Sequence, residues 1–125
     1  EPPVGISVPQ AMYDDFVKIS EPIQKIRPDY PFEVKVREPR KRPTRMGGTD
    51  ASVFAIEGVP TLGFTTEDFK GYDFDYGEIW HTERDLYTKN IPEYQEHTAT
   101  VTAIIALGVA NLDKQLSREG LYTEE

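Results

Sequence analysis

The chain has 125 residues, which is enough for one domain with a modest hydrophobic core. Its 22 acidic and 14 basic residues give a net charge of −8, which argues against nucleic acid or an anionic membrane as a partner. The chain has no cysteine, so disulfides, thiolate zinc sites and cysteine nucleophiles are excluded. No apolar run approaches the roughly 20 residues that span a bilayer. The first residue is Glu1 and not an initiator Met, so we expect an excised piece of a longer protein.

The first third of the chain predicts a helix followed by a strand. Apolar residues at helical spacing predict a helix over residues 9–27, with a kink or break near 20–21 because Pro22 lies inside it. Apolar and polar residues alternate over 32–37, which predicts a strand with one buried face. The stretch 39–48 is expected to be a loop, and its basic residues are typical of a solvated turn.

A short helix and a second strand are predicted next. Thr49 or Asp50 can cap a helix over 50–57, and Gly58 can end it. Residues 59–64 read as a short buried strand.

The second half is expected to contain a loop and one long helix. Residues 65–80 are aromatic and acidic without a period, which is typical of a functional loop, although their acids do not match a calcium-binding EF-hand. Asn90 as a cap, Pro92 in the first turn and Gly120 as a terminator predict a long amphipathic helix. These elements together predict an α/β fold.

His81 is the strongest candidate for chemistry. It lies at the exit of the aromatic loop beside Trp80, where an imidazole suits metal coordination or proton transfer. In a structural role it would be a partly buried ring bonded to Thr82 or Asp85. A lone histidine makes a poor zinc site, because zinc takes three or more protein ligands. The other histidine, His97, is expected to be a solvated or capping residue of the last helix.

Few other residues offer chemistry. Asp50 follows Gly47 and Gly48, so it can cap a helix or line an active-site wall that the backbone approaches closely. Nucleophile-elbow, phosphate-loop and dinucleotide-binding motifs are all lacking. The residues alone therefore do not make a self-contained enzyme.

Three motifs occur in a fixed order: GGTDASVF at 47–54, EGVPTL at 57–62 and WHTERD at 80–85, followed by the long helix. This combination resembles the C-terminal part of an M28-family zinc peptidase, over roughly residues 46–118. The resemblance implies a three-layer α/β/α sandwich. Residues 1–125 would form a single domain or the C-terminal part of a catalytic domain, with a small sheet packed by the N-terminal helix and the long C-terminal helix.

The resemblance also assigns roles to residues. The histidine of the last motif is a zinc ligand in that family, so His81 would bind metal, while Asp50 and Trp80 would line the pocket and Asp85 would hold the His81 loop. Family members often have tyrosine before this histidine, and Trp80 offers only an indole N–H in its place. The other ligands of the two-zinc cluster and the glutamate general base lie upstream of the matched segment, so no catalytic residue is assigned here.

The implied function is that of a zinc-dependent exopeptidase, with an aminopeptidase as the first choice. It would hydrolyse peptide substrates through metal-activated water and be exported to the periplasm or outside the cell. The chain alone is expected to be inactive and to self-associate through an unpaired sheet edge and an apolar face. Two alternatives remain open: an M20-type metallopeptidase, and a non-catalytic binding or dimerisation module in which His81 is structural.

Overall fold

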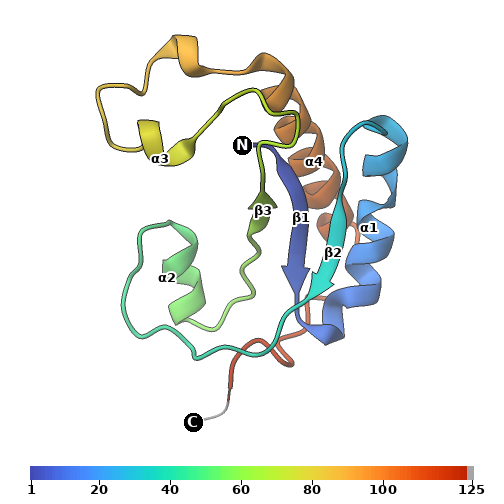
Figure 1. Cartoon of the computed structure of the whole chain (residues 1–125). Coiled ribbons are helices and arrows are strands. Elements are labelled where there is room, and N and C mark those ends of the chain that lie inside the picture. The colour runs from blue at the N-terminus through green and yellow to red at the C-terminus, as the bar shows by residue number, and fades with distance from the viewer. Residues whose placement is uncertain (124–125) are drawn as a thin grey trace.

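The computed structural model describes residues 1–123 and has a mixed α/β fold, which confirms the predicted class. Its sheet has the order β2-β1-β3: β1 (Pro3–Val8) runs parallel to β2 (Glu33–Val36) and antiparallel to β3 (Phe64–Thr66), as Figure 1 shows. The helices among these residues are α1 (Tyr13–Ile26), α2 (Ala51–Ile56), α3 (Tyr76–Ile79) and α4 (Pro92–Ala110), with short 3-10 turns η1 (Gln10–Met12) and η2 (Tyr87–Lys89).

The central strand, β1, is the element that the sequence does not predict. Its residues Val4, Ile6 and Val8 do alternate with smaller ones, but prolines flank the segment on both sides and obscure the pattern. Proline lacks the N–H that a ladder needs, so it normally argues against a central strand. Pro3 occupies the first strand position, where a missing donor is tolerated, and the burial of Ile6 and Val8 stabilises the strand.

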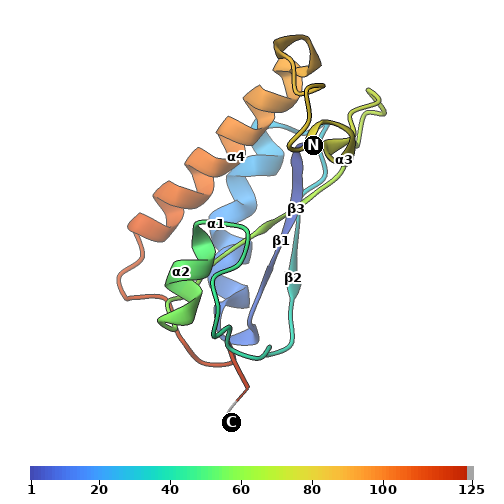
Figure 2. The ribbon, with the colours of Figure 1, turned by 90° about the vertical axis from the view of Figure 1, so that its left-hand side faces the viewer.

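Both long helices pack on the same face of the sheet. Figure 2 shows α1 and α4 on one side of the three strands, where Ile6 and Val8 share a core with Phe16 of α1 and Val101 of α4. Successive residues of a strand point to opposite faces. The register therefore places small or charged side chains on the other face: Ser7, Glu33, Lys35 and Thr65. The free face is polar, so the expectation of an exposed apolar face is wrong.

Exposed apolar side chains lie instead on the loops and on short and long helices alike, including Ile26 of α1 and Leu107 of α4. They include Met46, Phe54, Trp80, Leu86 and Tyr87, each more than half exposed. The outer edges of β2 and β3 have no partner strand within residues 1–123. Self-association stays a prediction, and it now depends on these edges and these side chains.

Helix α1 continues through Pro22, so the predicted break near residues 20–21 is not found. Phe16 and Ile23 are fully buried on either side of this position and anchor both ends of the helix to the core. Pro22 itself faces solvent, where the carbonyl that it leaves unpaired can bind water. The helix ends at Ile26, and its C-cap Arg27 is the residue before Pro28, as predicted.

In the middle of the chain one predicted strand and one predicted helix are confirmed, and the next strand begins later than predicted. The strand predicted over 32–37 is β2, and the helix predicted over 50–57 is α2, which closes before Gly58 at a φ of +74°. Asp50 is the N-cap residue, as predicted, although its side chain makes no capping hydrogen bond. The strand predicted over 59–64 begins only at Phe64, because Pro60 lacks a donor for the ladder.

The last helix is shorter than predicted. It ends at Ala110, with Asn111 as its C-cap, and not near Gly120, although Leu112 and Leu116 continue the apolar spacing. Asn and Asp side chains compete with helical hydrogen bonds, and Asn111 and Asp113 flank the point where the helix stops. The chain then turns back, so that Leu121 is 1% exposed in the same core as β1 and α1.

Candidate functional site

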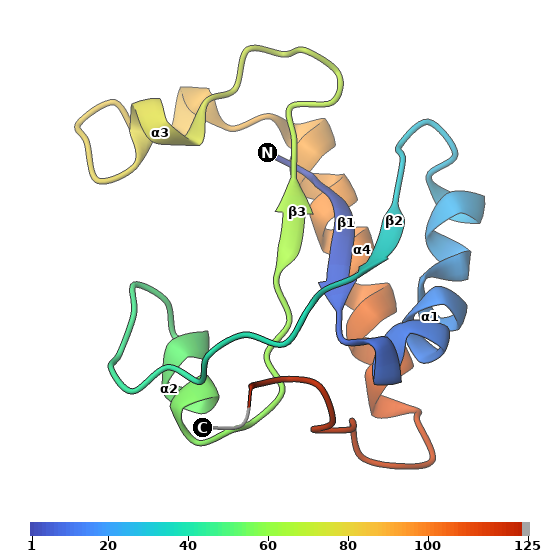
Figure 3. The same ribbon diagram turned by 60° about the horizontal axis from the view of Figure 1, so that its bottom comes forward.

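His81 lies on an arm that projects from the body of the fold between β3 and α4. We call residues 72–91 the His81 arm, and Figure 3 shows it extending away from the sheet on the side of β3. Its short helix α3 begins where the Asp75 carboxylate accepts a hydrogen bond from the Gly77 N–H at 2.9 Å. The helix ends where the Thr82 hydroxyl donates to the carbonyls of Glu78 and Ile79. The sequence thus builds a small, capped turn around His81.

The backbone of His81 is held in an unusual conformation. Its φ is 55°, in the left-handed region that a residue with a Cβ seldom occupies. Its ring stacks on the Trp80 indole with the centroids 4.1 Å apart, and Tyr76 extends the stack at 6.4 Å from Trp80. The His81 side chain is exposed, and neither ring nitrogen makes a hydrogen bond within residues 1–123. Both nitrogens are therefore free to bind a metal or carry a proton.

Of the other residues assigned by resemblance, Trp80 contacts His81, whereas Asp50 and Asp85 do not join it in a metal-binding group within residues 1–123. Asp50 precedes α2, on a separate projecting segment, and both it and Asp85 are exposed. Asp85 makes a turn through its backbone N–H to the Thr82 carbonyl, while its carboxylate makes no hydrogen bond with His81. Within residues 1–123 no group of three or more histidine and carboxylate side chains is placed to hold a metal.

Two carboxylates secure the base of the His81 arm. Asp68 accepts hydrogen bonds from the Tyr94 hydroxyl of α4 and from the backbone N–H groups of Tyr72 and Phe74, at 3.0 and 3.2 Å for the last two. The hydrogen bond from Tyr94 is the largest cause of the lowered pKa of Asp68. This carboxylate thereby ties the start of the arm to the helix that follows its end.

Glu93 is the second of these carboxylates. It accepts hydrogen bonds of 2.8 Å from the hydroxyls of both Tyr30 and Tyr72, and it lies 3.3 Å from the Lys70 ammonium. Lys70 also contacts Asp29 at 2.7 Å, and that hydrogen bond is the main reason for its raised pKa. The pKa of Glu93 is lowered, first by Tyr72 and then by Tyr30. The cluster joins the segment after α1, the arm and α4.

His97 is fully buried, so the prediction that it is a solvated or capping residue is wrong. Its ring stacks on Tyr30 at 3.9 Å between centroids, and its Nε2 lies 3.0 Å from the Pro3 carbonyl oxygen. Nε2 must donate to that oxygen, so Nδ1 is the unprotonated nitrogen, and it has no partner. Burial lowers the pKa of His97, which keeps the ring neutral.

The sequence gives little warning of these residues. Glu93 and His97 show the i,i+4 spacing of one helix face, but their partners Pro3, Tyr30 and Lys70 come from distant segments. The helices among residues 1–123 are too short or too polar to cross a membrane. No family model, curated protein or solved structure matches the chain.

Proposed function

We propose that the chain forms the C-terminal part of an M28-type zinc exopeptidase domain, in which His81 is one zinc ligand and a peptide is the substrate. The observation that carries the proposal is the state of His81. It is exposed, strained at a φ of 55° and free of hydrogen bonds within residues 1–123. Such strain in a non-glycine residue is concentrated at functional sites.

The His81 imidazole suits one ligand of a zinc site whose other ligands lie outside this chain. An imidazole nitrogen is a good zinc ligand, and bound zinc supplies a Lewis acid and an activated water. Asp50 and Asp85 form no metal-binding group with His81 within residues 1–123, so the proposal assigns them to the pocket wall and not to the ligands. The Trp80 indole, stacked on His81, would restrict the orientations of the ring.

A structural role for His81 has less support. A structural histidine is normally buried and hydrogen-bonded, as His97 is in this chain. The three-layer sandwich, the second zinc ion, aminopeptidase specificity and export belong to the same proposal. Another layer would lie on the free face of the sheet, where Gly5, Ser7 and Thr65 are small enough for close packing.

The proposal is tested in the longer protein that contains this sequence. His81→Ala should lower its zinc content and reduce hydrolysis of an aminoacyl p-nitroanilide by at least about 100-fold, because a metal ligand is lost. Glu83→Ala, an exposed change in the same turn, is the matched control and should keep both properties. Full zinc content and full activity in His81→Ala would refute the proposal.

The chain by itself provides a second test. With one ligand, it should bind zinc only weakly in a competition titration with a chromophoric chelator. Tight one-to-one binding that disappears in His81→Ala would contradict the claim that the remaining ligands lie outside this chain.

A further inference from the structure

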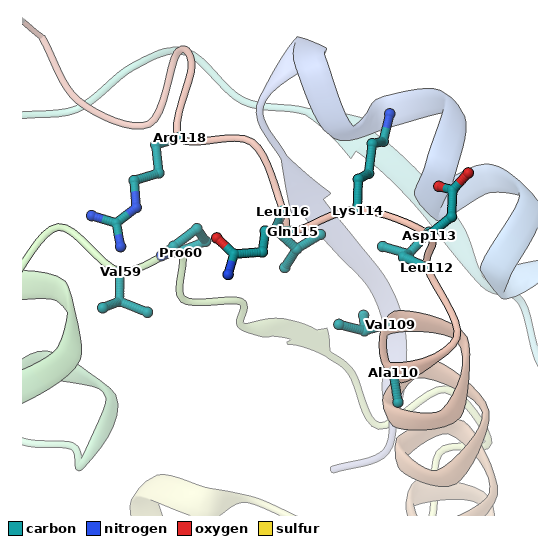
Figure 4. A pocket seen from close by; sticks show the side chains of 10 residues that line it. All are labelled: Val59, Pro60, Val109, Ala110, Leu112, Asp113, Lys114, Gln115, Leu116 and Arg118. Carbon is teal, nitrogen blue, oxygen red and sulfur yellow. The ribbon is translucent and has the colours of Figure 1, made fainter.

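A groove lies far from the His81 arm, between the segment after α2 and the segment after α4. Its volume is about 660 Å³, which falls within the range of small-molecule pockets. Figure 4 shows Val59 and Pro60 on one side and Val109 and Leu112 on the other. Figure 1 places the His81 arm near the start of α4, whereas this groove lies at its end. The two regions are therefore separate.

The lining of the groove combines aliphatic side chains with polar ones. Val59, Pro60, Val109, Leu112 and Leu116 all line it, and each is only partly buried. These side chains offer no hydrogen-bonding groups, so they favour an aliphatic ligand. An apolar lining alone does not define the ligand. The charged groups at one end of the groove define its polar part.

Two guanidinium groups converge at that end. A Cβ at Gly58 would lie 3.8 Å from Nη1 of Arg118 and 3.9 Å from Nη1 and Cζ of Arg42. Arg118 lines the groove, and Arg42 is fixed by a 2.7 Å hydrogen bond from its Nε to the Ile56 carbonyl. Gly58 has a φ of +74° and no side chain, so the space between the two cations stays open.

Within residues 1–123 neither cation has a carboxylate at ion-pair distance. No carboxylate of residues 1–123 lies within 4.0 Å of the Arg42 or Arg118 guanidinium. Arginine does not relieve such repulsion by losing its proton, so two converging guanidiniums favour an anion between them. A carboxylate matches the planar donors of a guanidinium in two-pronged hydrogen bonds.

The remaining polar groups of the groove do not oppose an anion there. Figure 4 shows Lys114 and Asp113 pointing away from Val59 and Pro60, and Lys114 pairs with Asp15 at 3.7 Å. The Gln115 amide points toward Pro60, near Arg118, where it can donate a further hydrogen bond.

We propose that this groove binds a carboxylate attached to a short aliphatic chain. The carboxylate lies over Gly58 between Arg42 and Arg118, and the aliphatic part lies along Val59, Leu112 and Leu116. Two sources share this chemistry: a medium-chain fatty acid, and the C-terminal residue of a peptide with an aliphatic side chain. The proposal does not depend on zinc or on peptidase activity.

Titration followed by NMR amide shifts and by calorimetry tests the proposal with the full chain. Octanoate and N-acetyl-leucine represent the two sources, and octanol and acetate are controls that lack the charge or the aliphatic chain. We expect saturable binding of octanoate or N-acetyl-leucine, with shifts at Gly58, Val59 and Leu112, and affinity at least tenfold lower for both controls. Whichever of the two carboxylates binds more tightly identifies the source.

Charge variants decide whether the arginines are responsible. Arg118→Gln and Arg42→Gln should each weaken binding by at least tenfold, whereas Arg45→Gln, in the same basic run but outside the groove, should leave it unchanged. Far-UV circular dichroism confirms that each variant is folded. The same titration in a Glu124→Gln, Glu125→Gln background excludes competition by the carboxylates of these two residues. Equal binding of octanol and octanoate, unchanged affinity in Arg118→Gln, or no binding in either background would overturn the proposal.

Discussion

Gly108 of α4 packs closely against Ile19 of α1 and gives the sharpest stability prediction. A Cβ at this position would lie 2.3 Å from Cγ2 and 3.1 Å from Cβ of Ile19, on α1. Ile19 cannot swing aside, because a β-branched residue in a helix has one strongly preferred χ1 rotamer. In Gly108→Ala the two helices must therefore separate, although α1 and α4 share the core.

The size of the effect follows from two opposing contributions. Replacing glycine by alanine inside a helix stabilises it by about 1 kcal/mol. Overpacking a well-filled contact costs about 1–3 kcal/mol, and a 2.3 Å contact with a stiff side chain belongs at the upper end. We expect Gly108→Ala to lower the free energy of unfolding by about 2 kcal/mol.

Urea unfolding followed by far-UV circular dichroism measures this change. Adding Ile19→Ala removes the clashing methyl groups, so the double variant should be more stable than the sum of the two single changes predicts. Replacing a glycine at an uncrowded helical position by alanine stabilises a protein by about 1 kcal/mol. If Gly108→Ala has that effect, the close contact between the two helices is wrong.

Two further predictions concern the cluster at the base of the His81 arm. Folding lowers the pKa of His97 from 6.5, so the unfolded chain binds the extra proton and the free energy of unfolding falls as the pH drops through about 6.5. Urea midpoints between pH 7.5 and 5 measure this loss of stability, which should be absent in His97→Gln. A pH profile that the substitution leaves unchanged would show that His97 is not the cause. Tyr72→Phe removes one hydrogen bond to Glu93, worth about 1 kcal/mol, and should speed amide exchange across the arm. Tyr87→Phe, at a side chain that is 91% exposed, should leave exchange unchanged, and equal effects of the two changes would contradict the role given to Glu93.

Local pattern predicted several elements of the fold correctly. The alternation of Phe32 to Arg37 gives β2, the apolar spacing before Pro28 gives α1, and the residues before Gly58 give α2. Each of these signals depends on neighbours within a few residues, which is the range over which helical and strand periodicity operates. The signal that marks His81 is local as well, because Trp80 and Thr82 adjoin it in sequence.

Contacts between distant segments determine the features that only the tertiary structure decided. β1 becomes a central strand because β2 and β3 pair with it on either side, and α4 stops at Ala110 while Leu121 returns to the core. The two histidines show the same division. His97 is buried against Tyr30 and Pro3, which are more than sixty residues away in sequence, while His81 is exposed on an arm. Periodicity reports which face of an element is apolar, but the partner that covers a polar group on that face is set by the packing of the whole chain.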